Sequence, residues 1–141
     1  MVEHEAPQEL RYTRDHAWVM LEDDGTLTVG LTYYAQTVMG EMVFVETPAI
    51  EAILSVGDPC GVVESVKDGI DIYAPVNGSV TDSNPNLKDE PDMVNSDPYG
   101  DGWIYKMEPE DEGDIEELLD ADEYAAFLAG LEDIENDPYA D

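Results

Sequence analysis

The strongest constraint on the fold lies in the middle of the chain, in residues 61–75. Residues 62–66 and 70–73 are rich in β-branched and aromatic side chains, which favour β-strands. Between these runs stand Lys67, Asp68 and Gly69, and aspartate followed by glycine is typical of a tight turn. The stretch therefore predicts a β-hairpin that presents Lys67 to solvent at its tip.

The chain contains very few other cations. It has five lysine and arginine residues against 35 aspartate and glutamate residues, for a formal net charge of −30. A lysine kept at a turn in such a composition is a candidate functional residue. The alternative is a solvated turn lysine without a function, because lysines are common at protein surfaces. The residues alone leave both interpretations open.

Short β-prone runs recur along the chain and are separated by turn residues. Residues 17–21 and 26–31 should form a hairpin, and Asn77-Gly78 indicates a two-residue turn that follows the lysine hairpin. Further strands are predicted at residues 41–46, 53–56, 79–82 and 103–107. Strands this short and this often interrupted are typical of a mostly β fold, a small sandwich or barrel, and not of a parallel α/β sheet.

Helices are expected between and after these strands. Thr32 should cap a helix over residues 33–39 that Gly40 ends, and residues 91–94 can form one helical turn. After an acidic linker at residues 108–114, a further helical segment is indicated by Ile115, Leu118 and Leu119.

A longer helix is predicted near the end of the chain. Asp120 and Glu123 match a capping box, which marks a helix start. The apolar side chains that follow fall on one helical face and should pack on the sheet. They are Tyr124, Phe127, Leu128 and Leu131.

The length of 141 residues suits one domain with its own core. We expect a flexible N-terminus at residues 1–9, a single domain at residues 10–134 and an acidic, flexible tail at residues 135–141. The high charge alone would favour disorder, but a hydrophobic content of 43% and the spread of aromatic residues favour a folded chain.

The excess of carboxylates also bears on environment and partners. Such a surface repels itself at low ionic strength, whereas molar salt shortens the screening length to about 3 Å. We therefore expect a salt-rich cytoplasm, as in a halophilic organism. The alternative is a dedicated acidic interface, but the acidic residues are distributed from Glu3 to Asp141. Five scattered cations exclude a phosphate-binding surface for nucleic acid.

The remaining chemistry-bearing residues offer weaker hypotheses. The single cysteine, Cys60, permits no internal disulfide, and the sequence shows no signal region and no membrane-spanning run, which predicts a cytoplasmic protein. Cys60 and His16 could act as nucleophile and base, but no third catalytic residue accompanies them. His4 and His16 lack the spacing of metal ligands, so we expect no metal site.

Several motifs, in the order in which they occur here, resemble the glycine cleavage H-protein family, and the likeness extends over about residues 10–130. The segment that surrounds Lys67 resembles the lipoyl-attachment segment of that family. The motifs are Tyr12-Thr13 with His16 and Trp18, residues 28–32 with 34–36, residues 43–46 with Pro48, residues 64–67, residues 71–78 and residues 95–103.

The resemblance implies a specific fold and role. The fold would be a barrel-sandwich hybrid of the lipoyl and biotinyl carriers, with short flanking helices and a C-terminal helix. Lipoate would be attached covalently to Lys67, and this arm would carry an aminomethyl group from glycine decarboxylase (P protein) to the aminomethyltransferase (T protein) before reoxidation by dihydrolipoyl dehydrogenase (L protein). The chain itself would be a carrier and not an enzyme. The lipoylating enzyme or the partners would recognise the surroundings of the lysine, which are Glu64, Ser65, Val66 and Asp68. The alternative for Glu64 and Asp68 is that they only solvate the surface.

Two departures and two related alternatives qualify this resemblance. Asp68 replaces the alanine that usually follows the lysine, and Ala17 stands where a glutamate is usual. A biotinyl domain would have methionines on both sides of the lysine, where this chain has Val66 and Asp68. An H-like protein that relays lipoate to 2-oxoacid dehydrogenase complexes would share every motif and remains an alternative.

Overall fold

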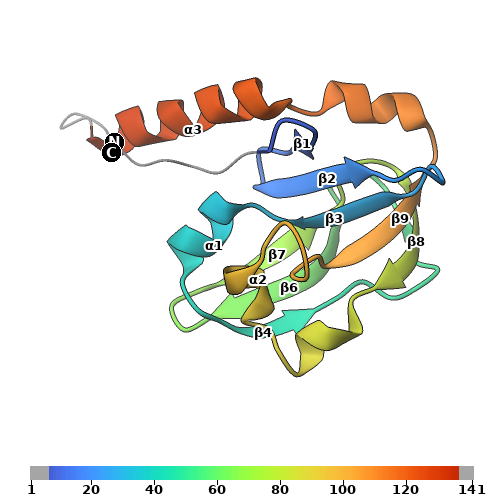
Figure 1. The fold of residues 1–141 in the computed structure, drawn as a ribbon, viewed down its shortest axis with the longest axis horizontal. Coiled ribbons are helices and arrows are strands. Elements are labelled where there is room, and N and C mark those ends of the chain that lie inside the picture. Colours follow the sequence, from blue (N-terminus) through green and yellow to red (C-terminus); the bar gives the residue numbers. More distant parts are fainter. Residues whose placement is uncertain (1–6, 137–141) are drawn as a thin grey trace.

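The computed structural model describes residues 7–136, and these form two antiparallel β-sheets with helices around them (Figure 1). The six-stranded sheet contains, in order, β1 (Arg11–Tyr12), β2 (Ala17–Leu21), β3 (Leu27–Leu31), β9 (Tyr105–Pro109), β8 (Gly78–Ser83) and β5 (Ile53–Leu54). The three-stranded sheet contains β4 (Met42–Glu46), β6 (Pro59–Ser65) and β7 (Gly69–Tyr73). The predicted mostly β fold with flanking helices is confirmed.

The lysine hairpin is formed by β6 and β7, as the sequence predicts. The two strands pair antiparallel, with Glu64 opposite Gly69 at the closed end. Lys67 lies in the connection between them. The strand β4 pairs with the other edge of β6, so β6 is the central strand of its sheet.

The first hairpin also forms where the alternating pattern places it. Strands β2 and β3 pair over their whole lengths, and Trp18 lies opposite Gly30. A Cβ atom on Gly30 would stand 2.6 Å from the Trp18 indole, so the buried ring requires a glycine at that position. This close approach explains a glycine in the middle of a buried strand.

Two boundaries differ from prediction. Gly78 is the first residue of β8, which pairs with β5 and β9, so Asn77-Gly78 is not a two-residue hairpin turn. A Cβ atom on Gly78 would stand 2.2 Å from the carbonyl oxygen of Glu108, so the glycine permits close strand contact. Strand β9 was predicted to begin at residue 103 but begins at Tyr105, since the Trp103 N–H donates to Gly100 O in a turn. At its other end the strand continues to Pro109, into the segment expected to be a linker.

Local end signals define the longer helices correctly. In α1 (Tyr33–Met39), the Thr32 hydroxyl accepts from Ala35 N, and Gly40 ends the helix with a φ of 83°. Asp120 and Glu123 form the predicted reciprocal capping box before α3 (Ala121–Asn136). The shorter helices are η1 (Pro85–Lys88), α2 (Met93–Ser96) and η2 (Glu112–Glu117), so the predicted turn at residues 91–94 is displaced by two residues.

Helix α3 covers β1 and β2 (Figure 1) and builds a second core beside the one between the sheets. Tyr124 and Leu128 are buried, and Phe127 and Leu131 are partly buried, which confirms the predicted stripe. The Tyr124 ring stacks on Tyr12 with a centroid distance of 4.7 Å.

The predicted flexible ends fall mostly on residues 1–6 and 137–141, which lie outside the described residues. Within the described part, the Tyr12 hydroxyl donates to Pro7 O at 2.7 Å, a local contact between residue 7 and β1. No helix among residues 7–136 is long and apolar enough to cross a membrane.

His16 occupies a strained, half-buried position against the second core. Its φ is 67°, and its Nδ1 shares a hydrogen bond of 2.9 Å with the Tyr124 hydroxyl. The rings of Tyr34 and Phe127 pack against the imidazole. Burial lowers the pKa of His16, although the neighbouring Asp15 opposes this shift.

This environment predicts a pH-dependent contribution to stability. Because the pKa of His16 is lower in the folded chain than the unfolded value of about 6.5, unfolding takes up a proton as the pH falls through that value. The folded chain should therefore lose stability on acidification from pH 7.5 to pH 5.5. His16→Asn should lack this histidine-dependent loss of stability, and asparagine tolerates the positive φ at this position. Melting temperatures of both proteins across this range measure the difference, and parallel curves would contradict the prediction.

Candidate functional site

The lysine tip is a tight turn organised by one serine. Ser65 Oγ accepts hydrogen bonds from Lys67 N (3.2 Å) and Asp68 N (3.1 Å), and Ser65 N donates to Asp68 O (2.7 Å). The Asp68 carboxylate then accepts from Gly69 N at 2.8 Å. Ser65 is buried, so this turn is anchored at the end of β6 and holds Lys67 at its outermost point.

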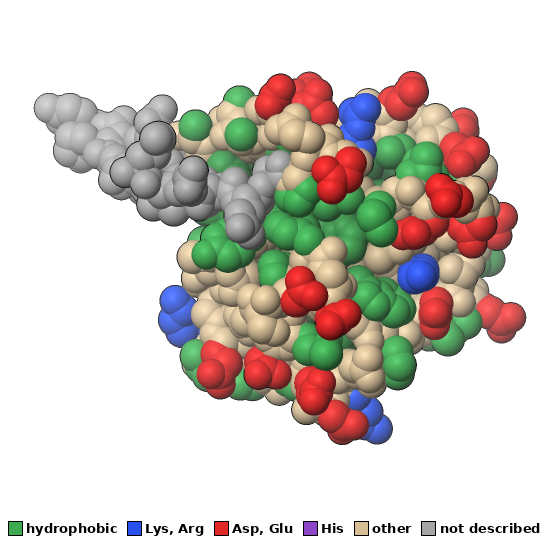
Figure 2. Space-filling view, viewed as in Figure 1, with side chains coloured by type: hydrophobic (Ala, Val, Ile, Leu, Met, Phe, Trp, Pro, Cys, Tyr) green, Lys and Arg blue, Asp and Glu red, His purple; other side chains and the backbone are tan. Residues whose placement is uncertain are grey.

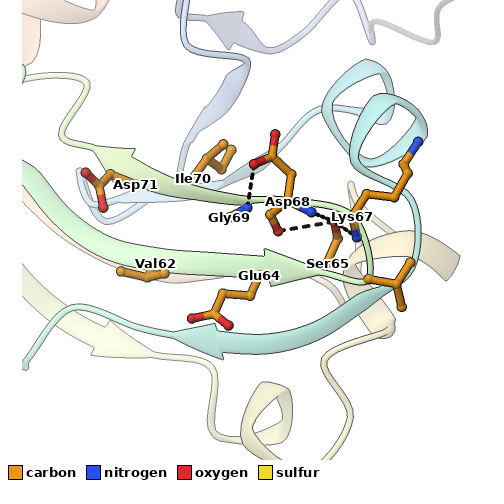
Figure 3. A pocket seen from close by; sticks show the side chains of 9 residues that line it. Val62, Glu64, Ser65, Lys67, Asp68, Gly69, Ile70 and Asp71 are labelled. Carbon is orange, nitrogen blue, oxygen red and sulfur yellow. Dashed lines mark hydrogen bonds between the residues drawn. The ribbon is translucent and has the colours of Figure 1, made fainter.

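The neighbours of Ser65 in the predicted site are exposed. The exposed residues are Glu64, Val66, Lys67 and Asp68, and Val66 retains 65% of its accessible surface. Figure 3 shows the Lys67 side chain extending from the tip beside α1, while Glu64 points elsewhere. The structure therefore brings all five predicted residues to one turn and makes Ser65 its internal support.

The tip also rests on the connection between α1 and β4. Val66 N donates to Glu41 O at 3.0 Å. The Lys67 Cε lies 3.4 Å from the position that a Cβ atom on Gly40 would occupy, so the lysine stem passes over this glycine. Sequence analysis did not predict these contacts. They join segments that are about 25 residues apart in the chain, and only the pairing of β4 with β6 brings these segments together.

A shallow depression with a volume of about 520 Å³ follows the hairpin, and Figure 3 shows the side chains that line it. Its lining combines the Lys67 amine with the carboxylates of Glu64, Asp68 and Asp71. A single cation among three carboxylates gives this surface an acidic character. The depression is too open to enclose a substrate, which suits a site that another protein must reach.

The other two lysines occupy different environments. Lys88 ends the short helix η1, and Lys106 lies on β9 with its Nζ 5.3 Å from the centre of the Trp103 ring. Neither stands at a hairpin tip. Among the three lysines, Lys67 is therefore the one that stands in the turn of a β-hairpin.

The structure does not support the enzymatic alternative. The Sγ of Cys60 contacts the Tyr105 hydroxyl at 3.8 Å, whereas the imidazole of His16 pairs with Tyr124. Burial raises the pKa of the Cys60 thiol, which disfavours the nucleophilic thiolate. His4 lies outside the described residues, and within residues 7–136 no group of three or more His, Cys, Asp or Glu side chains is arranged to hold a metal ion.

Comparison with known proteins decides the family. The sequence model described as glycine cleavage H-protein matches residues 10–130. The chain belongs to the glycine cleavage H-protein family. The glycine cleavage system H protein of Alkalilimnicola ehrlichii is 49% identical over 128 residues, which cover 91% of this chain and 98% of that protein. That of Enterobacter sp. is 52% identical over 122 residues, covering 86% and 95%.

A solved structure agrees with the fold. The crystal structure of a glycine cleavage system H protein from Mycobacterium marinum superposes with a TM-score of 0.80 at 37% sequence identity. The match covers 87% of this chain and 98% of that chain. The predicted barrel-sandwich fold is thus the fold of an H-protein family member.

Family membership establishes the general role of the chain. It is a lipoyl carrier of the glycine cleavage system and not itself an enzyme, and its lipoate is bound covalently to a lysine. It works with the glycine decarboxylase, the aminomethyltransferase and the dihydrolipoyl dehydrogenase of that system. The relay of lipoate to other complexes is not favoured.

The Ser65 hydroxyl provides the first test of the site geometry. Ser65→Ala removes the acceptor for two tip N–H groups, which are then left to water, so the free energy of unfolding should fall by about 1 kcal/mol. The amides of Lys67 and Asp68 should also exchange with solvent faster. Urea unfolding and amide hydrogen exchange measure both effects. Ser79→Ala, on β8, is the control, and equal tip exchange in both variants would contradict the assignment.

Proposed function

We propose that Lys67 is the lysine to which lipoate is attached. The observation that carries this proposal is the position of an exposed primary amine at the tip of β6 and β7, on a turn anchored by the buried Ser65. An amide bond to a carboxylate needs such an amine in reach of a second protein. Lys88 is also exposed but ends a short helix, and Lys106 is partly buried on β9, so neither stands on such a turn.

The chain's own residues supply the geometry that a carrier needs. Lipoate bound at Lys67 would supply a dithiolane that can accept an aminomethyl group, and a partner enzyme would regenerate it from the dithiol left once that group has been passed on. The turn at Ser65 fixes the backbone of Lys67, while the rest of the lysine side chain remains outside the core. From bond lengths, a lysine side chain extended by a lipoyl group reaches on the order of 14 Å from the backbone. A fixed base and a long arm together permit visits to several enzymes.

The exposed neighbours of Lys67 form the proposed recognition surface for the lipoylating enzyme. Glu64 and Asp68 present carboxylates on both sides of the lysine, and Val66 adds an exposed apolar side chain. Ser65 contributes indirectly because its hydroxyl is used within the turn. We therefore assign direct contact to Glu64, Val66 and Asp68, and turn geometry to Ser65.

Mass spectrometry of the protein from its native host tests the attachment residue. Intact mass and peptide mapping should show one lipoyl amide, located on Lys67. Lys67→Arg should abolish lipoylation, because guanidinium is not acylated, whereas Lys88→Arg should remain lipoylated. Both substitutions keep the positive charge. If lipoylation is lost in Lys67→Arg and kept in Lys88→Arg, the loss therefore identifies Lys67 as the attachment residue. A lipoyl group on Lys88 or Lys106 would overturn the proposal.

We further propose that residues 10–134 form the carrier domain and that the chain works in a salt-rich cytoplasm. Figure 2 supports the second point, since acidic side chains are spread over the described part of the visible face and do not gather on one patch. Mutual repulsion among them opposes folding, and salt screens exposed charges. The surface thus fits adaptation to salt better than one acidic interface.

Salt should therefore stabilise the folded chain. We expect the melting temperature to rise steadily between low and molar potassium chloride. Because screening depends on ionic strength, sodium chloride at the same concentrations should give a similar rise. Differential scanning calorimetry measures the shift, and an unchanged melting temperature between low and molar salt would contradict the adaptation.

A further inference from the structure

One side-chain amide joins three points of the segment on which the lysine tip rests. Asn95, in α2, accepts at Oδ1 from Met42 N (2.8 Å), and its Nδ2 donates to Gly40 O (2.8 Å) and Gln36 Oε1 (3.0 Å). Both donors of the amide are therefore used, together with one acceptor site. We call these three hydrogen bonds the amide clamp. Its partners lie 53 to 59 residues before Asn95.

The clamp encloses the residue that holds the tip. Glu41 lies between Gly40 and Met42, and its carbonyl oxygen accepts the hydrogen bond from Val66 N at 3.0 Å. Val66 directly precedes Lys67, whose stem passes over Gly40. Fixing the backbone on both sides of Glu41 therefore fixes the support of the lysine.

Strand pairing provides only part of this support, because on the tip side it consists of the Met42–Ser65 pair and the bond from Val66 N to Glu41 O. The register of β4 and β6 shifts between Met42 and Phe44, which interrupts the ladder on the side near the tip. The N–H of Met42 is taken up by the Asn95 side chain. At this irregular end of the sheet, the amide clamp reinforces the short stretch of pairing that remains between β4 and β6.

We propose that Asn95 is a positioning residue for the lipoylation of Lys67. This inference rests on the proposed function, since it takes Lys67 as the attachment residue. Asn95 acts through residues 40–42: it keeps the tip in one orientation, so that the lipoylating enzyme meets an amine that is already aimed outward. A preorganised tip loses less conformational freedom on binding, and this strengthens association without a new contact.

Asn84 offers a matched control for substitution at Asn95. Its amide also makes three hydrogen bonds, donating to Asp101 O and Trp103 O and accepting from Asn86 N. None of these partners lies in residues 36–42 or in the hairpin. Asn84→Ala therefore removes an equivalent set of hydrogen bonds at another place.

Amide hydrogen exchange of the full, unlipoylated chain tests the clamp. Asn95→Ala should accelerate exchange at Val66 about tenfold, the effect expected from weakening a hydrogen-bonded support. Exchange at Val63, in the buried middle of β6, should stay close to that of the unaltered chain after correction for any change in global stability. Asn84→Ala should not change the ratio of Val66 to Val63 exchange. An unchanged Val66 rate, or equal acceleration at both valines, would overturn the proposal.

Lipoylation kinetics test the consequence for Lys67. With a purified lipoate ligase, lipoate and ATP, Asn95→Ala should raise the KM for the carrier several-fold and leave kcat nearly unchanged. Equal kinetics of Asn95→Ala and Asn84→Ala would overturn the positioning role. If the unaltered chain is not modified at Lys67, the proposed function fails, and the positioning role fails with it. The exchange measurement still shows separately whether the clamp holds Val66.

Discussion

The lysine site depends on the pairing of β6 with both β4 and β7. This pairing places Val63 and Ile72 in the core, where both are almost fully buried. A slip of one residue would turn Val63 toward solvent, so burial specifies the register strongly. The register in turn determines that β6 ends at Ser65, whose hydroxyl then closes the turn. The position of the Lys67 backbone is therefore set by core packing further along the strands.

The tip is also connected to the second core, through α1. The hydroxyl of Thr32 shares a hydrogen bond of 2.8 Å with the buried Tyr124 hydroxyl of α3, and it accepts from Ala35 N at the start of α1. The other end of α1 is Gly40, next to the stem of Lys67. Packing of α3 thus helps to place a helix whose C-terminal end supports the lysine. The C-terminal helix, although separate from the hairpin, belongs to the same supporting structure.

Features with local causes could be predicted from sequence. Thr32 and Gly40 bound α1 because a side-chain cap and a positive φ act within one helical turn. The lysine hairpin and the capping box at Asp120 follow from equally local chemistry. Local chemistry places Lys67 in a turn, but the attachment residue could be proposed only from the resemblance of the surrounding segment to the H-protein family.

Features with distant causes could not be predicted in this way. Gly78 has the sequence signature of a turn, but its role is set by the approach of the Glu108 carbonyl from another strand. Asn95 lies within a recognisable motif, yet its partners at residues 36–42 become visible only when α2 is placed beside α1. The sequence offers no period or spacing that joins such positions. Tertiary packing decides them.

Attachment of lipoate at Lys67 would also change what the partners meet. Acylation converts the ammonium group to a neutral amide, so the formal net charge becomes one unit more negative than −30. The carboxylates of Glu64, Asp68 and Asp71 would then lack the one cation that shares their surface. With lipoate attached at Lys67, the lipoylating enzyme would approach a tip of mixed charge, whereas the enzymes of glycine cleavage would approach one with carboxylates alone. Because salt screens exposed charges, the rigid geometry of the tip becomes more important for recognition as the salt concentration rises.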